Sequence, residues 1–378
     1  CNMKESKKQQ IIYIENVEWN YIKARPQYIA ENLSKDFDIT VYSPYSYKLR
    51  KRNFKVDGSC DVKFVKKLPF EGRFPLIARL NQLYKKYYFK CRIKNDIPIV
   101  YVTYPEAYEF IPETYEGIVI YDCMDDMLEF DMSAQSRMLV QRLEKALYKR
   151  ADIVFVSSEN LKRKLFDRYS IKKDCYLVRN GYDGNIANVP LISEQKNKNF
   201  VVCYFGTISS WFDFDVIKKS LDAIPNLEYK FIGPIEKMIA PYEHERIHYI
   251  RPVPHDELQH MTSDADAYIL PFKVNDLIEA VDPVKFYEYI NFSKNIISVY
   301  YDEISRFEDF VYFYKDTNQY INVIKKLMQD NTLKYSQEKR LKFLGESTWD
   351  NRAQMMSGVI VKELNTGAKH NIEVGAEQ

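Results

Sequence analysis

Short apolar runs recur along the chain, and each is followed by a polar loop and then by a helical pattern. The first run covers residues 10–16, and Pro26 is placed to open the following helix, because its missing N–H costs nothing in a first turn. The next run covers residues 37–42. Continuous apolar runs are typical of strands buried on both faces, so the pattern predicts parallel β-α-β units and an α/β fold.

This alternation stops once and then restarts. Residues 184–199 show no hydrophobic periodicity, and a new buried run begins at Phe200. Two domains joined by a linker are therefore expected. Their predicted bounds are 1–183, 184–199 for the linker, 200–345, and 346–378 for a terminal helix and tail. Further strands are expected at 61–65, 97–103, 117–121, 151–156, 175–178, 227–232, 247–250, 265–270 and 296–299, and further helices at 75–94, 133–149, from 213, at 317–330, 336–343 and 347–364.

Composition narrows the class of protein. The chain has 378 residues, of which 46% are hydrophobic and 29% are charged, as in soluble globular proteins. Its six cysteines are scattered without paired spacing, which favours reduced thiols and argues against a structural zinc site. Residues 1–10 are polar and no apolar run is long enough to span a bilayer, so a cytoplasmic protein is expected.

The charge is distributed unevenly. Residues 48–94 contain fifteen Lys and Arg against three acidic residues, whereas the whole chain has a net charge of +2. Such a block predicts an anionic partner surface. Within it, the 75–94 helix is expected to carry apolar residues on one side and basic residues around the rest. This pattern fits a helix at a membrane surface, or alternatively a core-packed helix with a solvated basic face. The apolar set is Leu76, Leu80, Leu83, Tyr84 and Tyr87, and the basic set is Arg79, Lys85, Lys86, Lys90 and Arg92.

One helix start carries a distinctive polar pattern. Asp282 is an expected N-cap, followed by Pro283, and the apolar pattern continues for about two turns. Lys285 and Glu288 then share one face near the positive end of the helix. A cation and a carboxylate in this position would suit a ligand with phosphates and a ribose. The alternative is an ordinary surface helix with an i,i+3 ion pair.

Several stretches resemble the GT-B glycosyltransferases, in particular the bacterial teichuronic-acid and xanthan type. The residues that carry the resemblance are Trp19 with the sequence RPQ from Arg25, RADIVFVSSENLKRKL (150–165), RPVPHDELQHMTSDADAYILPF (251–272), DPVKFYEYINFSKNII (282–297) and STWDNRAQMMSGVIVKEL (347–364). This resemblance implies two Rossmann-like parallel-sheet domains facing a central cleft, with a C-terminal helix that crosses back to the N-terminal domain. It is weakest over residues 45–96.

The resemblance also implies a donor site. Lys285 would contact the diphosphate and Glu288 the ribose of a nucleotide sugar. Backbone from Arg251 to Val253 would hold the base. The other expected donor-site residues are Gly206, Thr207 and Phe272. Gly206 follows a predicted strand and would let the backbone approach a phosphate closely.

The N-terminal half offers a candidate base. Three carboxylates between Asp122 and Asp126 follow a predicted strand, and their mutual repulsion should raise at least one pKa. Asp125 is the preferred catalytic base and Asp122 the second choice, while an Asp-rich helix-capping turn is the alternative. We expect Trp19, Arg25 and Tyr104 to line the acceptor side.

Two departures bear on the stereochemistry. Retaining members of the family usually have a second Glu where this chain has Ala280, and a His where it has Asp122. Direct displacement with an Asp base is the expected route, while the choice between an inverting and a retaining outcome stays open at this point. No metal or cofactor is required in this type. The histidines that might suggest one are interpreted as surface residues: His244, His248, His255 and His260.

The predicted function is transfer of a sugar from a nucleoside diphosphate to a surface polysaccharide or lipid-linked glycan. Two alternatives stay open at this point. A nucleotide-sugar 2-epimerase shares the fold but needs no acceptor, and a catalytically silent subunit would bind a partner or membrane only. A nucleic-acid partner is not expected.

Overall fold

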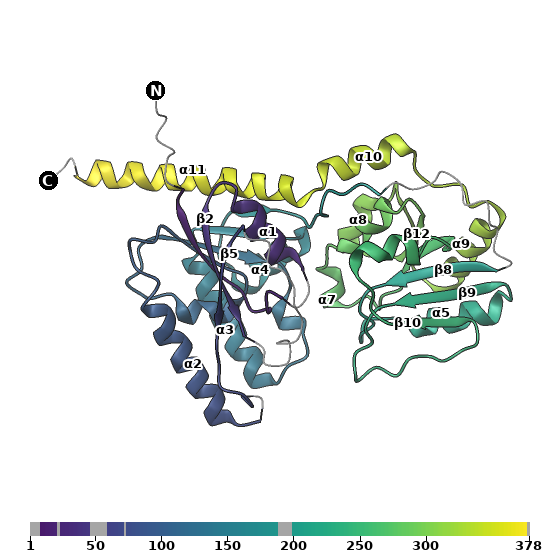
Figure 1. The fold of residues 1–378 in the computed structure, drawn as a ribbon, viewed down its shortest axis with the longest axis horizontal. Helices are drawn as coiled ribbons and strands as arrows, with labels where there is room; N and C mark the ends of the chain where they lie inside the picture. Colours follow the sequence, from purple (N-terminus) through teal and green to yellow (C-terminus); the bar gives the residue numbers. More distant parts are fainter. Residues whose placement is uncertain (1–7, 21–22, 46–58, 72, 188–198, 376–378) are drawn as a thin grey trace. The chain divides into compact units, whose positions relative to one another are not determined.

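The computed structural model describes residues 8–20, 23–45, 59–71, 73–187 and 199–375, with side chains up to residue 366. The chain divides into two compact units. Unit 1 comprises residues 1–183 and 349–378, and unit 2 comprises residues 184–348 (Figure 1).

Unit 1 is built on a seven-stranded sheet in which every pair of neighbours is parallel. The strand order is β3-β2-β1-β4-β5-β6-β7, so the direction of winding reverses between β1 and β4. The central strands are buried throughout, as their continuous apolar sequences predict. The strands are β1 (Gln10–Ile14), β2 (Asp38–Pro44), β3 (Asp61–Val65), β4 (Ile99–Val102), β5 (Ile118–Cys123), β6 (Ile153–Val156) and β7 (Cys175–Leu177).

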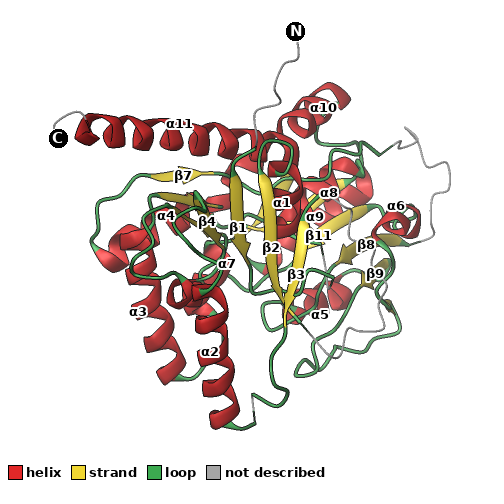
Figure 2. Cartoon of the chain, turned by 60° about the vertical axis from the view of Figure 1, so that its left-hand side comes forward, coloured by secondary structure: helices red, strands yellow, loops and turns green. Residues whose placement is uncertain are grey.

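Helices cover both faces of this sheet, and their starts follow local rules. Ser158 caps α4 by accepting a hydrogen bond from the Leu161 N–H. The last helix, α11, packs on α1, where the rings of Tyr28 and Trp349 stack with centroids 5.3 Å apart (Figures 1 and 2). The helices of unit 1 are α1 (Arg25–Leu33), α2 (Pro75–Lys90), η1 (Pro105–Phe110), η2 (Met127–Glu129), α3 (Ala134–Arg150), α4 (Glu159–Tyr169) and α11 (Trp349–Gly375).

Unit 2 repeats the plan with six parallel strands in the order β10-β9-β8-β11-β12-β13, and the winding reverses between β8 and β11. Its strands are β8 (Phe200–Phe205), β9 (Leu227–Ile232), β10 (Ile247–Ile250), β11 (Ala267–Leu270), β12 (Asn295–Val299) and β13 (Val311–Tyr314). Its helices are α5 (Phe214–Ala223), η3 (His255–Glu257), α6 (Leu258–Met261), α7 (Asp276–Glu279), α8 (Val284–Asn291), η4 (Asp302–Phe307), α9 (Thr317–Gln329) and α10 (Gln337–Glu346).

Two expectations from sequence need correction here. The strand β13 was not predicted; its apolar run, 310–314, stands directly between Asp309 and Lys315. Asp282 was predicted to cap α8, but the N-cap position belongs to Pro283 and the Asp282 side chain turns elsewhere. It accepts a hydrogen bond from Tyr287 (3.0 Å) and pairs with Arg306. A guanidinium is a stronger partner for a buried carboxylate than a single helix N–H.

Candidate functional site

In open parallel sheets, ligands bind beyond the carboxyl ends of the strands, at the point where the winding reverses. In unit 2 this point lies between β8 and β11, and Gly206 follows β8 directly. Gly206 has φ +140°, and Gly233, which follows β9, has φ +142°. A Cβ on Gly233 would stand 2.2 Å from the carbonyl oxygen of Gly206. Only glycine fits these two turns, and their backbones consequently lie close together.

Lys285 occupies the space that Gly206 leaves. A Cβ on Gly206 would lie 2.2 Å from Lys285 Cε, so the lysine side chain runs against the turn after β8. Its ammonium lies 5.7 Å from the centre of the Tyr204 ring. Within the described part of the chain, Lys285 has no hydrogen-bond or ion-pair partner. Burial lowers the pKa of Lys285, and the nearby charge of Glu288 offsets this only in part.

Lys285 also stands in the first turn of α8, where backbone N–H groups give the helix a positive end. A cation, the positive end of a helix and a glycine turn at one place form a binding site for an anion, because each contributes positive potential. The arrangement can therefore hold a phosphate group.

Glu288 lies one turn further along α8, but it does not pair with Lys285. Instead, His255 Nε2 stands 2.7 Å from Glu288 Oε1. The alternative of an ordinary surface helix required an ion pair between Lys285 and Glu288, and the described residues do not form that pair. His255 was predicted to be an ordinary surface residue, and it is indeed more than half exposed. Its contact nevertheless ties the loop after β10 to α8, and that loop contains Arg251 and Val253.

The remaining donor-site candidates have different surroundings. The Thr207 carbonyl accepts a hydrogen bond from the Tyr204 hydroxyl (2.8 Å), which fixes the turn after β8. Phe272 is buried and packs edge-on against Tyr204 with centroids 6.3 Å apart. Arg251 is exposed directly after β10, and Val253 is half-buried. The structure therefore joins Gly206, Thr207, Phe272 and Lys285 around one tyrosine.

In unit 1 the corresponding edge is rich in charge, and most of it is paired. Asp122, near the end of β5, is fully buried. It accepts two hydrogen bonds from Arg25, from Nη2 at 2.8 Å and Nε at 3.1 Å, and one from the Tyr101 hydroxyl at 2.8 Å. Arg25 also donates to the Val178 carbonyl at 2.7 Å. Asp122 and Arg25 thus hold each other and fasten α1 to the ends of β5 and β7.

Asp126 is paired as well. Its carboxylate accepts hydrogen bonds from Arg168 (2.8 and 3.0 Å) and lies 3.1 Å from Lys164. Burial raises the pKa of Asp126, but the two cations outweigh burial and lower it below its usual value. It also caps η2 through the Leu128 N–H. The capping-turn alternative is therefore correct for this one carboxylate.

Asp125 differs from both neighbours. It is half-buried, and its carboxylate has no hydrogen-bond or ion-pair partner among the residues that the structure describes. Burial raises its pKa to about 6; Arg25 opposes this shift, while Asp122 and Asp126 add to it. A carboxyl group with this pKa is mostly ionised at pH 7 and is still basic enough to accept a proton.

The acceptor-side candidates lie near the switch point between β1 and β4. Trp19 is buried, and its backbone N–H donates to Ser43 Oγ at 2.8 Å. Tyr104 is half-buried, and burial raises its pKa. Sequence analysis missed Glu15, which follows β1 directly and is 2% exposed. Burial raises the pKa of Glu15 to about 8. A carboxylate directly after a buried apolar strand was the available signal.

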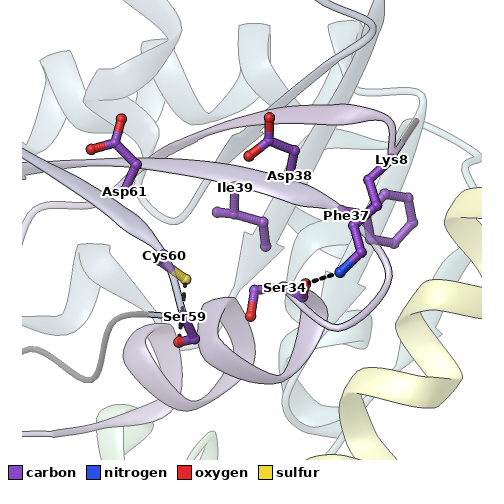
Figure 3. Close-up of a pocket in the computed structure, with 8 residues that line it drawn as sticks. All are labelled: Lys8, Ser34, Phe37, Asp38, Ile39, Ser59, Cys60 and Asp61. Carbon is purple, nitrogen blue, oxygen red and sulfur yellow. Dashed lines mark hydrogen bonds between the residues drawn. The ribbon is translucent and has the colours of Figure 1, made fainter. Parts of the chain in front are cut away.

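A cavity of about 470 Å³ opens at the opposite edge of this sheet (Figure 3). It is lined by residues at the amino ends of β2 and β3, among them Asp38 and Asp61, and by Lys8, whose ammonium donates to the Ser34 carbonyl at 2.8 Å. Because the candidate residues of unit 1 all follow the carboxyl ends of strands, this cavity is separate from them. Among the described residues, no helix is both long and apolar enough to cross a membrane.

Two Rossmann-like units with wholly parallel sheets, each with polar residues at its switch point, define the GT-B fold, and comparison with solved structures confirms it. Sucrose-phosphate synthase from Thermosynechococcus elongatus superposes with a TM-score of 0.71 at 14% identity, covering 95% of this chain and 100% of that one. The Anabaena protein HepE, solved with UDP and glucose, gives a TM-score of 0.62 at 12% identity, covering 97% and 99%.

Comparison of sequences gives a narrower likeness. The chain is 22% identical over 229 residues to a Bacillus subtilis protein described as "Putative teichuronic acid biosynthesis glycosyltransferase TuaH". The match covers 54% of this chain and 56% of that protein, so it spans about half the length of each. The likeness to a teichuronic-acid type sequence is thereby confirmed. No family model matches the chain.

Proposed function

We propose that this protein is a glycosyltransferase that moves a sugar from a nucleoside diphosphate to a glycan or lipid-linked acceptor. The observation that carries this proposal is Lys285, a cation at a helix start that packs against a glycine turn and has no hydrogen-bond or ion-pair partner among the described residues. An enzyme that binds a diphosphate needs such a charge, because the leaving group gains negative charge as the sugar bond breaks.

Each group has a separate role. Lys285 would neutralise the diphosphate leaving group, and Glu288 would accept hydrogen bonds from the ribose hydroxyls in place of His255. Asp125 would take the proton of the acceptor hydroxyl as its oxygen attacks the anomeric carbon, while the diphosphate leaves with the electrons of the broken bond. A single displacement of this kind inverts the anomeric centre. No metal ion takes part in this scheme.

The comparisons support the class of substrate. The Bacillus subtilis relative is described as a teichuronic acid biosynthesis enzyme, and HepE was solved with UDP and glucose. We extend this to a nucleotide-sugar donor and an acceptor that belongs to a cell-envelope polysaccharide. Transfer would take place in the cytoplasm, with the protein peripheral at the inner face of the membrane.

A thermal-shift comparison of UDP, GDP, ADP, CDP and dTDP tests the donor site. A ligand that binds only the folded state at about 100 times its Kd stabilises it by about 2.7 kcal/mol. We expect one diphosphate to raise Tm clearly more than its monophosphate, and Lys285→Met to remove the difference. No shift with any diphosphate would refute the proposal.

Incubation with the matching nucleotide sugars then separates the candidate reactions. Transfer to a glycan acceptor supports the proposal, and conversion of the donor to its C2 epimer would show the epimerase instead. Binding with no conversion of any donor would show a silent binding subunit.

A further inference from the structure

Helix α2 carries an apolar ridge that faces solvent. Its four residues, Leu76, Leu80, Leu83 and Tyr87, are 69%, 45%, 56% and 71% exposed. At 3.6 residues per turn their spacing places all four within an arc of about 60°. Eight of the twenty large apolar side chains that are exposed in the described residues lie between residues 68 and 87. Isolated exposed apolar residues are ordinary, whereas a continuous row of them marks a contact surface.

The other face of α2 is firmly attached to unit 1. Asn81 is buried and bonds to both the N–H and the carbonyl of Leu68, at 2.7 and 3.0 Å. Phe89 stacks on Phe110 of η1 with centroids 4.9 Å apart. Figures 1 and 2 show α2 at the periphery of unit 1. The face of α2 that contains Asn81 and Phe89 therefore packs against unit 1. The alternative that the leucines of α2 are core residues is wrong.

Basic residues border the ridge. Residues 66–94 contain nine Lys and Arg against one Glu. Arg79 and Lys90 are exposed and lie within about 70° of the centre of the ridge, on the same side of it. Lys86 lies on that side too, but it pairs with Glu109 at 2.7 Å. The strongly basic residues 46–58 lie outside the described part of the chain. The ridge therefore lies beside two cations that have no ion-pair partner among the described residues. Such a surface is complementary to a partner with an apolar interior and an anionic border.

We propose that α2 lies in the interfacial layer of an anionic bilayer. The ridge would enter the boundary between headgroups and acyl chains, and Arg79 and Lys90 would contact lipid phosphates. A second copy of the chain fits the same face less well, because the basic rows of two copies would then approach each other. The purpose of docking rests on the proposed function, since a lipid-linked acceptor lies at such a surface.

Sedimentation with vesicles tests this placement without any sugar transfer. We expect binding to vesicles of phosphatidylglycerol and phosphatidylcholine in equal parts, and little binding to phosphatidylcholine alone. At 1 M salt the Debye length falls from about 8 Å to about 3 Å, so the electrostatic part of binding should disappear. A fraction should survive because the ridge contributes independently of charge. Failure to bind the anionic vesicles would overturn the proposal.

Two variants separate the contributions. Leu80→Gln/Leu83→Gln/Tyr87→Gln should weaken binding at least tenfold at all salt concentrations. Arg79→Gln/Lys90→Gln should weaken it at low salt only. The matched controls, Phe166→Gln/Met328→Gln/Leu341→Gln and Lys325→Gln/Lys342→Gln, change exposed residues elsewhere and should bind as the parent does. All of these side chains are exposed, so the fold should persist, and Tm verifies this.

The outcomes distinguish the membrane from other partners and from the proposed function. Unchanged vesicle binding by the ridge variant would refute the proposal. A parent protein that sediments as a dimer, together with a monomeric ridge variant, would show a self-interface instead. Transfer to a short soluble acceptor should be equal in the parent and the ridge variant. If neither transfers sugar while vesicle binding behaves as expected, the proposed function fails and the membrane surface stands.

Discussion

The residues at the carboxyl ends of the strands differ in charge between the two units. At the carboxyl edge of the unit 1 sheet, Asp122 and Asp126 are both neutralised by arginines from other elements. Of these three neighbouring aspartates, only Asp125 has no hydrogen-bond or ion-pair partner among the described residues. At the edge of unit 2, Asp282 is neutralised by Arg306 in the same manner, but the unpartnered group is a cation, Lys285. Beside an Asp–Arg pair, unit 1 therefore presents a carboxylate without an ion-pair partner in the described structure, and unit 2 presents an ammonium without one.

This difference suits different tasks. A general base must keep its position while a proton moves, so paired neighbours that immobilise its loop are useful. A lysine that serves as a phosphate-binding residue destabilises the folded state in the absence of ligand, because a partly buried charge without an ion-pair partner is disfavoured. Sites of this kind commonly trade stability for function. Substitutions at Asp125, Arg25, Lys285 and His255 test this difference between the two units.

Asp125→Asn should have the largest effect. Loss of a general base reduces transfer about 10²- to 10⁴-fold. Nucleotide affinity should be unchanged, because the base acts on the acceptor; steady-state kinetics and calorimetric titration separate the two. If Asp125→Asn remains active while Asp122→Asn does not, the base is Asp122.

The pH dependence of the parent protein checks the same assignment. A base works only when it is deprotonated, so kcat/KM should rise with pH through about 6 and then level off. The contribution of Asp125 to the free energy of unfolding should instead fall as pH rises. Because the pKa of Asp125 is raised in the folded state, that state binds more protons between about pH 4 and 6, so the free energy of unfolding falls across this range and stays lower above pH 6. Asp125→Asn should consequently raise Tm at pH 8 and lose this advantage near pH 4.

Arg25→Met should have the next largest effect, and it concerns stability. Removing one partner of a buried pair leaves Asp122 charged and unpaired, which costs about 3–5 kcal/mol. Urea denaturation measures the loss. Arg25→Met/Asp122→Leu removes both charges and should recover much of the stability. A double variant no more stable than Arg25→Met would show that packing, rather than the orphaned charge, causes the loss.

Lys285→Met should weaken donor use about ten- to a hundredfold, since a hydrogen bond to a charged group contributes about 1.5–3 kcal/mol. Without ligand, the same variant should be as stable as the parent or more stable, in contrast to Arg25→Met. Donor KM and Tm are the measurements, and Lys325→Met is the matched control. A marked loss of stability with unchanged KM would identify Lys285 as structural.

His255→Ala should have the smallest effect. An exposed contact of this kind is worth at most about 1 kcal/mol, which corresponds to about fivefold in affinity. We expect nucleotide binding to tighten by no more than this, because Glu288 is then released for the ribose. Calorimetric titration measures the change. Much weaker binding would instead make His255 a part of the donor site.

Most of the fold could be predicted because strands and helices have recognisable local sequence patterns. Buried runs such as 151–156 and 200–205 are continuous in sequence, and the cap at Ser158 needs only neighbours three residues away. Both parallel sheets followed from the order of these elements. The strand β13, between charged neighbours, was missed. The cap assigned to Asp282 was wrong because the partner of Asp282, Arg306, lies 24 residues further along the chain.

Local sequence patterns were enough to specify the two sheets, the loops at their carboxyl ends and the chemical types of residue in those loops. They could not show which of the three neighbouring aspartates lacks a partner among the described residues, because the partners of the other two come from distant positions, such as Arg25, 97 residues before Asp122. The tertiary structure decided this, and it likewise decided that the leucines of α2 face solvent. Periodicity describes how an element is divided into faces, but which face is covered depends on the other elements that pack against it.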